Sequence, residues 1–537
     1  MPGDARAAHG SAGLAWLVAA SFAAVMLVAS ARSGLVFDSH LFFPYGDAIL
    51  RYLTGAGPWP LGHMRLGFEA YGSLGGLGAA LTSALFHDRL GVMDALQGHN
   101  AFVVLTAAAV VGVTGRLAAD LAGPRVATIA ALVLATMPRF VAEAAGNASD
   151  VPAALAWSAC LAGIVRGVLE VRVAPLAAAA LAGAALGAIR TPSLLFLPLV
   201  PALWLVLDSA ALAGVARVFR AARWWQLGGV VGLGLVGLIL FRPLAWFEPG
   251  IVLRTTLDLY IAPPFWVSKG ITTVFYHGQV VQGPRTFHLL MLGITTPLLI
   301  LVTAVAGIVA AWRRYPSAAR LSVAWLVVAV GRYAVLDLGN YDGVRHIVDA
   351  LPALALLAAI GIDTAIAALP PRPALHAAVV AALVFPGVLG VWRLYPYPVA
   401  YYNALVGGLR GAAPRFETEY SGAAYREALA WAAAELRPED VLWTVRPYDR
   451  PFVDVQASYL GIANLRTWAG AASGLRVPPG GRVFTAYLFR PGPVERAPAG
   501  LDPETLPLVH EVGREGVPFL RIREIPPARL QGISAGR

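Results

Sequence analysis

The sequence is poor in charge, and nearly all of its positive charge is arginine. Only 13% of its 537 residues are charged, against about a quarter in soluble proteins, while 58% are hydrophobic. Such a chain is too apolar for a water-soluble fold and needs a bilayer. Lys269 is the single lysine. The arginines lie singly between apolar runs instead of in one stripe, so the formal net charge of +10 does not indicate nucleic-acid binding.

Cysteine and several catalytic motifs are also scarce. The one cysteine, Cys160, lies inside an apolar run, which excludes a disulfide framework and a cysteine metal site. The sequence has no Walker loop, no dinucleotide fingerprint after a strand, no His-Glu-x-x-His and no Gly-x-Ser-x-Gly elbow. These absences argue against nucleotide-dependent, zinc-protease and serine-hydrolase chemistry.

Long apolar runs fill the first three quarters of the chain. A membrane span needs about 17 to 25 residues, and about eleven runs qualify. The first is longer than the core of a signal peptide, so we expect it to remain as a span. The short stretch 71–86 is left uncounted, as either a span or an interfacial helix. The runs are 12–31, 100–119, 125–142, 152–170, 174–190, 192–208, 227–245, 288–312, 320–337, 347–369 and 375–392.

The arginines between these runs predict the orientation. Cytoplasmic loops retain positive charge, so the side on which arginines recur in alternate loops between the runs is predicted to be the cytoplasm. An odd number of spans then places the tail outside. The predicted location is the cytoplasmic (inner) membrane, with many passes. The arginines that share one side are Arg6, Arg116, Arg125, Arg166, Arg172, Arg217, Arg220, Arg223, Arg313, Arg314, Arg320 and Arg372.

The chain therefore divides into two predicted domains. Residues 1–392 form a polytopic α-helical membrane domain, in which an outer loop at 32–99 carries an acidic motif. The hydropathy is lower over residues 393–537, and the pattern of this segment predicts a small extracytoplasmic α/β domain. Its expected helix is 425–436, and its expected strands are 441–445, 483–489, 508–512 and 519–525.

Ionisable residues gather at the predicted outer ends of the spans. Asp38 follows the first run by a few residues, with His40, Tyr45 and Asp47 after it. A charge at a bilayer edge is costly unless it is paired or functional, so Asp38 is a candidate catalytic residue. The alternative is an ordinary solvated carboxylate.

Two further turns on the same side contain candidate residues. Asn147 and Asp150 precede the 152–170 run, where helix capping by Ser149 or Asp150 is the rival explanation. Arg190 interrupts the apolar sequence at the next outer turn. Buried without a partner it would be very costly, so we expect it to be paired.

The turn before the 347–369 run contains Asp342, Arg345 and His346. Arginine offers a fork of donors that suits phosphate, although an Asp342–Arg345 pair could simply hold the turn. The other membrane side has no equal set, and the middles of the spans look apolar, unlike a transport pathway. We therefore predict that Asp38 and Asp150 meet in one outward-facing pocket.

At these residues the sequence resembles the membrane-embedded GT-C glycosyltransferases of the protein O-mannosyltransferase and aminoarabinose transferase type, glycosyltransferase family 39 and its relatives. The likeness covers most of the chain. One departure is Ser39, where many relatives have a glutamate after the aspartate. The segments that carry the resemblance are Phe37-Asp38, the Asn147, Asp150 and Pro152 motif, Tyr341 to His346, Tyr401 to Gly408, Arg415 to Glu417, and Tyr420.

The resemblance implies an inverting transfer of a sugar from a polyprenyl-phosphate donor to a protein, lipid or glycan acceptor. Asp38 would be the general base, and Asp150 would assist it. Arg190, Arg345 and His346 would bind the donor phosphate, and the acceptor pocket would contain His40, Tyr45, Asp47, Asn147 and Asp342. No obligatory metal is expected, with a divalent ion as the alternative. A flippase of lipid-linked sugars and an inactive envelope scaffold remain rival hypotheses.

Overall fold

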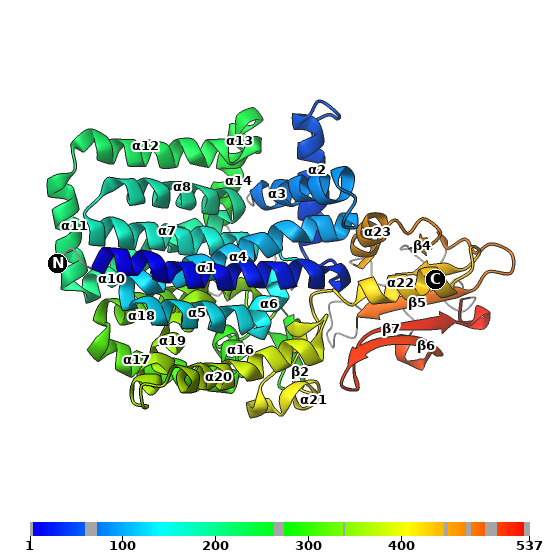
Figure 1. Ribbon diagram of the computed structural model, residues 1–537. Coiled ribbons are helices and arrows are strands. Elements are labelled where there is room, and N and C mark those ends of the chain that lie inside the picture. Colours follow the sequence, from blue (N-terminus) through cyan, green and yellow to red (C-terminus); the bar gives the residue numbers. More distant parts are fainter. Residues whose placement is uncertain are drawn as a thin grey trace.

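The computed structural model describes residues 4–59, 72–261, 273–336, 339–444, 449–468, 474–488 and 502–530. A large helical part contains the N-terminal three quarters of the chain, and a smaller part built on a sheet follows at one end of it (Figure 1). We call that end of the helical part the sheet end and the other the opposite end. The fold class expected from the sequence is confirmed.

All eleven predicted apolar runs are mainly helical where they are described. Six helical segments are long and apolar enough to cross a membrane, and three bent helix pairs raise the number to as many as nine. Two shorter apolar helices, α8 (Val173–Ile189) and α12 (Trp224–Leu240), account for the remaining runs. The six long segments are Gly13–Arg32, Ala95–Ala122, Asp150–Glu170, Pro316–Leu336, Arg345–Ala367 and Pro373–Leu394.

The helical part is built from consecutive helices that run back and forth. They are α1 (Asp4–Ala29), α2 (Ser39–Leu53), α3 (Leu74–Ser83), α4 (Ala95–Ala122), α5 (Pro124–Thr136), α6 (Pro138–Ala144), α7 (Asp150–Glu170), α8, α9 (Thr191–Phe196), α10 (Leu199–Leu207), α11 (Ser209–Ala221), α12, α13 (Pro243–Phe247), α14 (Pro249–Ile261), α16 (Phe287–Thr295), α17 (Leu298–Arg314), α18 (Pro316–Leu336), α19 (Leu351–Ala367) and α20 (Pro373–Leu394). Short helical turns join them at η1 (Ser30–Arg32), η3 (Ala84–Arg89) and η4 (Arg345–Ala350), and a hairpin of β1 (Thr273–Tyr276) and β2 (Gln279–Gln282) precedes α16.

The bends between paired helices follow from prolines and caps in the sequence. A proline lacks the amide that continues a helix, and Pro138 starts α6 at 69° to α5. Pro297 similarly separates α16 from α17, which meet at 113°. Asp208 accepts hydrogen bonds from the first amides of α11, which turns 110° away from the preceding helices.

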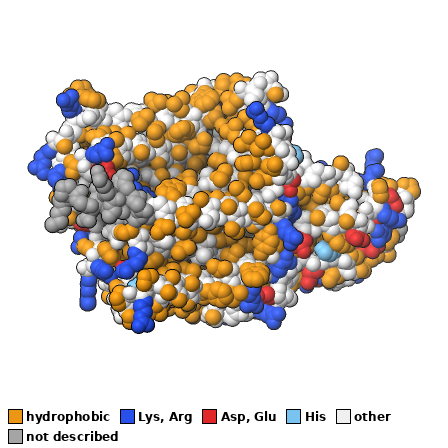
Figure 2. Space-filling model, viewed as in Figure 1, with side chains coloured by type: hydrophobic (Ala, Val, Ile, Leu, Met, Phe, Trp, Pro, Cys, Tyr) orange, Lys and Arg blue, Asp and Glu red, His pale blue; other side chains and the backbone are white. Residues whose placement is uncertain are grey.

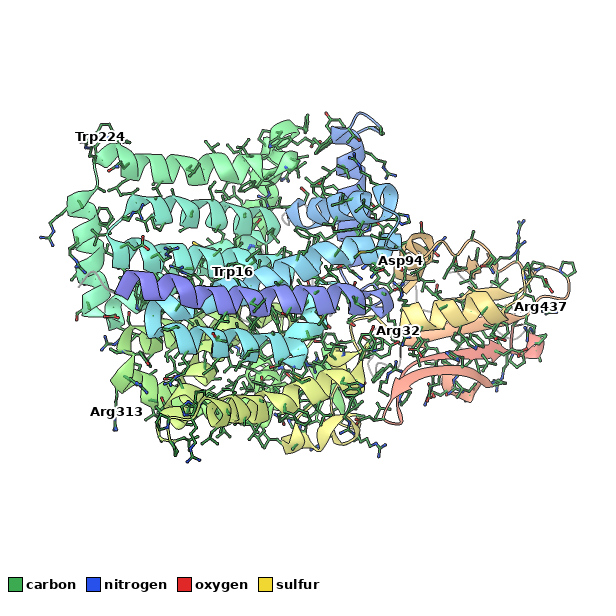
Figure 3. The ribbon with its side chains drawn as sticks, viewed as in Figure 1. Trp16, Arg32, Asp94, Trp224, Arg313 and Arg437 are labelled. Carbon is green, nitrogen blue, oxygen red and sulfur yellow. The ribbon has the colours of Figure 1, made fainter. Side chains whose placement is uncertain are left out.

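The helices pack in a continuous series from α12 through α8, α7, α4, α5 and α19 to α17 (Figure 1). Glycines allow the closest approach: a Cβ atom on Gly307 in α17 would lie 1.9 Å from the Leu357 carbonyl oxygen of α19. Figure 2 shows a broad apolar belt over one face of this part, with charged side chains gathered toward its two ends. Trp224 and Arg313 mark the opposite end, whereas Arg32 and Asp94 lie at the sheet end (Figure 3).

The C-terminal part contains one mixed five-stranded sheet with the order β4-β3-β5-β7-β6. Its predicted helix and four predicted strands are present, and the sequence analysis missed α23 and β4. The strands are β3 (Val441–Trp443), β4 (Arg466–Trp468), β5 (Val483–Leu488), β6 (Leu508–Arg514) and β7 (Val517–Ile525). The helices and turns are η5 (Pro398–Ala400), η6 (Ala404–Val406), α21 (Gly408–Ala412), α22 (Tyr425–Glu435), α23 (Asp449–Tyr459) and η9 (Pro503–Thr505). Residues 445 and 489, the ends of two predicted strands, lie outside the described residues.

The C-terminal part holds the loop between α1 and α2 in place. The Leu35 amide donates to Gln456 Oε1 at 2.6 Å, and the Phe37 amide donates to the Ser421 carbonyl oxygen at 2.7 Å. Both bonds lie within three residues of Asp38. The loop that follows the first span is therefore fixed by contacts with α23 and with the segment just before α22.

Candidate active site

Asp38 lies in the loop before α2 in a strained backbone conformation. Its φ is 71°, in the left-handed region that residues with a Cβ seldom adopt. The side chain does not cap α2. Instead, its Oδ2 lies 3.1 Å from Arg345 Nη2, and the side chain remains 30% exposed. Asp38 is thus a partly accessible carboxylate held by a buried guanidinium.

Ser39, the residue that departs from the family pattern, joins two loops of the site. Its buried hydroxyl donates to the Gly146 carbonyl oxygen at 2.7 Å. This bond brings the loop of Asp38 beside the turn that contains Asn147 and Asp150. The serine at this position therefore has a structural partner in the second outer turn.

Asn147, rather than Ser149 or Asp150, caps α7. Its Oδ1 accepts hydrogen bonds from the amides of Ser149 and Asp150, and its Nδ2 donates to Asp150 Oδ2 at 2.9 Å. The same Nδ2 donates to Glu143 Oε2 at 2.7 Å. The alternative considered from the sequence, that Ser149 or Asp150 caps this helix, is therefore wrong, because Asn147 caps it. The Asp150 carboxylate is left available for other contacts.

Asp150 makes its main ion pair with Arg190, at the turn between α8 and α9. Both side chains are buried. Arg190 also donates to Tyr333 Oη at 3.3 Å and reaches His346 Nδ1 at 3.0 Å. The buried arginine expected to need a partner thus has three.

Arg345, in η4, is surrounded by three aspartates. Its Nη2 lies 3.1 Å from Asp342 Oδ2 and 3.1 Å from Asp38, and its Nε lies 3.8 Å from Asp150 Oδ2. The predicted Asp342–Arg345 pair exists, but it is one contact of a larger cluster. Asp38 and Asp150 thus approach the same guanidinium, while their meeting in one outward-facing pocket stays a prediction.

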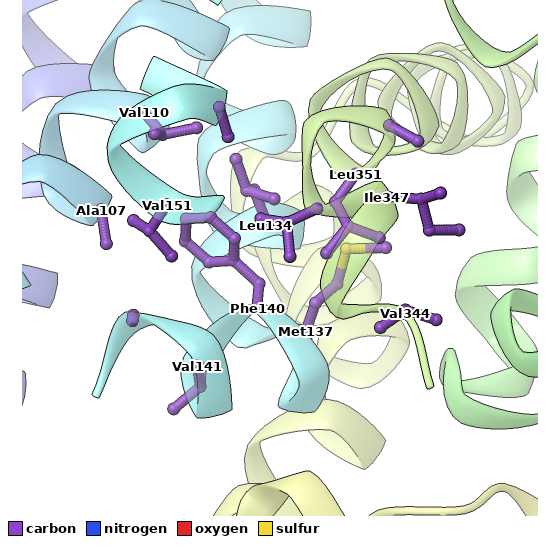
Figure 4. Close-up of a cluster of buried hydrophobic side chains, with 14 of the residues drawn as sticks. Ala107, Val110, Leu134, Met137, Phe140, Val141, Val151, Val344, Ile347 and Leu351 are labelled. Carbon is purple, nitrogen blue, oxygen red and sulfur yellow. The ribbon is translucent and has the colours of Figure 1, made fainter. Parts of the chain in front are cut away.

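Apolar packing fixes the relative positions of the elements that carry these charges (Figure 4). Val151, next to Asp150, and Ile347, two residues after Arg345, are fully buried. They belong to one hydrophobic cluster with Leu134, Phe140 and Leu351. A well-packed core resists displacement, so the distance between the two charged turns is set by the helices behind them.

Sequence reasoning missed a second, deeper ion pair. Arg332 in α18 and Asp349 in η4 are both buried, with Nη2 and Oδ2 separated by 2.8 Å. The Arg332 guanidinium also lies 5.2 Å from the ring centre of Trp157. The sequence does indicate that Arg332 needs a partner, because it is a lone charge within the apolar run 320–337. Glu143, at the end of another run, was missed for the same reason.

Three residues assigned to an acceptor pocket, His40, Tyr45 and Asp47, lie on α2. Asp47 contacts His99 Nε2 at 2.8 Å and Tyr459 Oη at 2.6 Å, about 13 Å along α2 from Asp38 at 1.5 Å per residue. His40 packs edge-on against Phe452, with its ring centre 5.6 Å away. Tyr45 is half-buried on α2. Asp47 thus joins α2, α4 and α23 instead of facing Arg345.

Burial has a large effect on His40. Removal from solvent lowers the pKa of His40 to about 4, although the Asp38 carboxylate opposes the shift. A histidine with that pKa is neutral at physiological pH. His40 therefore adds no positive charge next to Asp38.

The opposite end also contains paired charges, although the pairs described there do not equal the cluster around Arg345. Asp363 pairs there with Arg125 and lies 3.6 Å from Arg314, and Asp208 lies 3.3 Å from Arg320. These pairs join neighbouring helices. The sheet end differs in having several carboxylates around one arginine, one of them partly exposed. Within the described ranges, no group of three histidine, cysteine, aspartate or glutamate side chains could hold a metal.

Compared by sequence, the chain matches no protein-family model and no curated protein. Compared by structure, it is similar to the apo state of ArnT from Cupriavidus metallidurans, with a TM-score of 0.51 and 14% identity over 94% of this chain and 97% of ArnT. The fold is of the GT-C type.

Two weaker structural similarities accompany this one. ArnT bound to undecaprenyl phosphate gives a TM-score of 0.47 at 15% identity, over 94% of this chain and 97% of ArnT. The oligosaccharyltransferase AglB from Archaeoglobus fulgidus, in complex with an inhibitory peptide and a dolichol-phosphate, gives 0.43 at 11% identity, over 82% of this chain and 63% of AglB. At such identities, the GT-C likeness describes how the helices are arranged, and the site must be argued from its own residues.

Proposed function

We propose that this protein is an inverting glycosyltransferase that moves a sugar from a polyprenyl-phosphate carrier to an acceptor at the outer face of the cytoplasmic membrane. The observation that carries the proposal is the contact of a partly exposed carboxylate, Asp38, with the buried Arg345 guanidinium. A base and a phosphate-binding cation then lie side by side at the end of a membrane-spanning helix bundle. The GT-C fold shared with ArnT, an aminoarabinose transferase, supports the same reaction class.

In the proposed reaction, Asp38 accepts the proton of the acceptor hydroxyl as its oxygen attacks the anomeric carbon. The bond between that carbon and the phosphate oxygen breaks, and the lipid phosphate leaves with the bonding electrons. Attack opposite the leaving group inverts the configuration. Arg190, Arg345 and His346 would stabilise the departing phosphate through charge-assisted hydrogen bonds in a site with little water.

The ion pairs of the site suggest how the base becomes active. Arg345 holds Asp38, Asp342 and Asp150 in the absence of a donor. The donor phosphate also offers charged, bidentate acceptors and would compete with these carboxylates for the guanidinium. Asp38, the most exposed of the three, is the one most easily displaced. Donor binding would therefore free Asp38 to act as the base.

The same cluster supports a reaction without an obligatory metal. Three carboxylates around one point commonly bind a divalent cation, and here the Arg345 guanidinium lies among them. The positive charge that would stabilise the phosphate is then supplied by arginine. The C-terminal part and Asp38 are proposed to be extracytoplasmic, because the short arginine-bearing loops between the spans, such as the one at Arg313, lie at the opposite end.

The direct test is Asp38→Asn in purified protein, with sugar release from a polyprenyl-phosphate donor as the measurement. Loss of a positioned general base is expected to lower turnover by about 10² to 10⁴ at saturating donor. Asp47→Asn is the matched control, because Asp47 lies on α2, the helix that follows Asp38, but contacts His99 and Tyr459. Unchanged turnover in Asp38→Asn would exclude this base. Movement of intact lipid-linked sugar across vesicles, without cleavage, would favour a flippase.

A further inference from the structure

A small cavity lies beneath the outer ion pairs. Its volume is about 10 Å³, the space of roughly one oxygen-sized group. It is lined by Asp150, Trp157, Arg190, Arg345, His346 and Asp349, with four smaller side chains between them. Trp157 follows Asp150 by seven positions on one face of α7, about 10 Å deeper along the helix. The cavity thus extends inward from the proposed phosphate site.

Three of the described residues that line this cavity carry a buried donor without a partner. Within the described chain, Trp157 Nε1, His346 Nε2 and Arg345 Nε make no hydrogen bond. The His346 tautomer follows from its other nitrogen: Nδ1 accepts from Arg190, so a neutral ring carries its proton on Nε2. Leaving a buried donor unpaired is costly. All three unpaired atoms on the lining residues are donors, so the matching ligand is rich in acceptors.

The Arg332–Asp349 pair supports this arrangement from behind. The Arg332 guanidinium lies over the Trp157 ring, and its Nη2 donates to the His346 carbonyl oxygen at 3.1 Å. Arg332 therefore contacts both the Trp157 indole and the His346 backbone. The two carboxylates that line the cavity are each paired with an arginine, Asp150 with Arg190 and Asp349 with Arg332. An entering anion would not meet an uncompensated negative charge.

We infer that this cavity binds one non-bridging oxygen of the donor lipid's phosphate, with Trp157 Nε1 and His346 Nε2 as its hydrogen-bond donors. The inference rests on the proposed function and deepens it by adding Trp157 to the phosphate site. A hydroxyl group is a poorer fit than a phosphate oxygen, because a hydroxyl must also donate. Arg332 acts as a positioning residue. The remaining phosphate oxygens face Arg190 and Arg345.

The test compares the binding of two probes, a long-chain polyprenyl phosphate and the matching polyprenol without phosphate, to the full-length protein in lipid nanodiscs. Trp157 is replaced by 3-benzothienylalanine, which keeps the ring shape but has sulfur in place of the N–H, and separately by phenylalanine. The matched control is Trp325→Phe. Trp325 is also buried with an unpaired Nε1 in the described chain, but it does not line the cavity.

Loss of one hydrogen bond to a charged phosphate is expected to raise the Kd for polyprenyl phosphate about tenfold. The Kd for polyprenol should not change, and Trp325→Phe should change neither value. A Kd for polyprenyl phosphate in the benzothienylalanine protein equal to that of wild type would overturn the inference while leaving the proposed function intact. Equal wild-type affinity for the two probes would instead refute the phosphate donor, and the cavity's role with it.

Discussion

The buried ion pair of Asp150 and Arg190 is predicted to make a large contribution to stability that depends on both partners. The perturbation is a double-mutant cycle of Asp150→Asn, Arg190→Gln and the two together. The side chains are only 6% and 10% exposed, so each single change leaves a charge in a nearly dry environment. Breaking a buried pair in this way typically costs about 3 to 5 kcal/mol.

The structure places the expected single-mutant costs at the lower end of that range. Arg190 would keep Tyr333 and His346 as partners, and Asp150 would keep Asn147 and the more distant Arg345. We therefore expect about 3 kcal/mol for each single change. The double variant removes both charges and should cost less than the sum, with a coupling of about 2 kcal/mol.

The assay is unfolding in mixed micelles with an increasing fraction of dodecyl sulfate, followed by circular dichroism. The matched control is the surface pair of Arg393 and Glu515, 2.8 Å apart, in which the arginine side chain is 61% exposed. Each of its single changes should cost under about 1 kcal/mol. Additive costs for Asp150→Asn and Arg190→Gln would refute the reasoning, because they would show that the two side chains do not share one interaction.

Three other predictions concern pH, backbone geometry and metals. Burial lowers the pKa of His40 to about 4, so the unfolded chain takes up this proton first. The free energy of unfolding should therefore fall by roughly 3 kcal/mol between about pH 6.5 and 4. His40→Phe should remove that part of the pH dependence. A difference in unfolding free energy between the two proteins that stays constant over this pH range would contradict the prediction. Gly343→Ala places a Cβ 2.5 Å from Tyr420 Oη at a φ of 61°, and it should abolish most sugar release. Gly408→Ala has a similar φ of 65° but meets nothing within 4 Å, so it should retain activity. Equal losses of activity in the two variants would show that the contact with Tyr420 is unimportant. A chelator should leave turnover unchanged, since Arg345 lies among the three carboxylates, and a loss restored by Mg²⁺ would disprove this.

The helical architecture could be predicted because its signal is local. A run of apolar residues predicts a helix wherever it lies in the chain, and each of the eleven runs is mainly helical where described. The way the runs are divided could not be predicted so well. The 125–142 run bends by 69° at Pro138, and the 288–312 run bends by 113° at Pro297. Whether a proline kinks, breaks or merely starts a helix depends on neighbours that are distant in sequence.

The sequence singled out site residues by one rule, that a charged residue in an otherwise apolar segment needs a partner or a function. Asp38, Asp150, Arg190 and Arg345 each stand out against apolar sequence, and they meet in the structure. Asp47 satisfied the same rule, but its partners come from α4 and α23. Sequence can show that a carboxylate needs a partner, while the choice between Arg345 and His99 depends on packing.

The deeper pair of Arg332 and Asp349 was missed for a different reason. Both residues fall inside or beside apolar runs that were treated as uniform spans. Each lies within about two turns of the sheet end of its helix, so the pair adjoins the outer cluster instead of lying at mid-membrane. Polar groups inside the predicted spans therefore do not by themselves support a transport pathway.

The serine at position 39 bears on whether the site can function. In the resemblance described above, many relatives have a glutamate where this chain has Ser39. In the structure Ser39 is buried, and its hydroxyl donates to the Gly146 carbonyl oxygen. A glutamate carboxylate cannot donate in that position when ionised and would bring a negative charge to a carbonyl oxygen. The serine instead ties the Asp38 loop to the turn that precedes Asp150. Ser39 thus helps to hold the Asp38 loop beside Arg345, and the proposed base, Asp38, is retained.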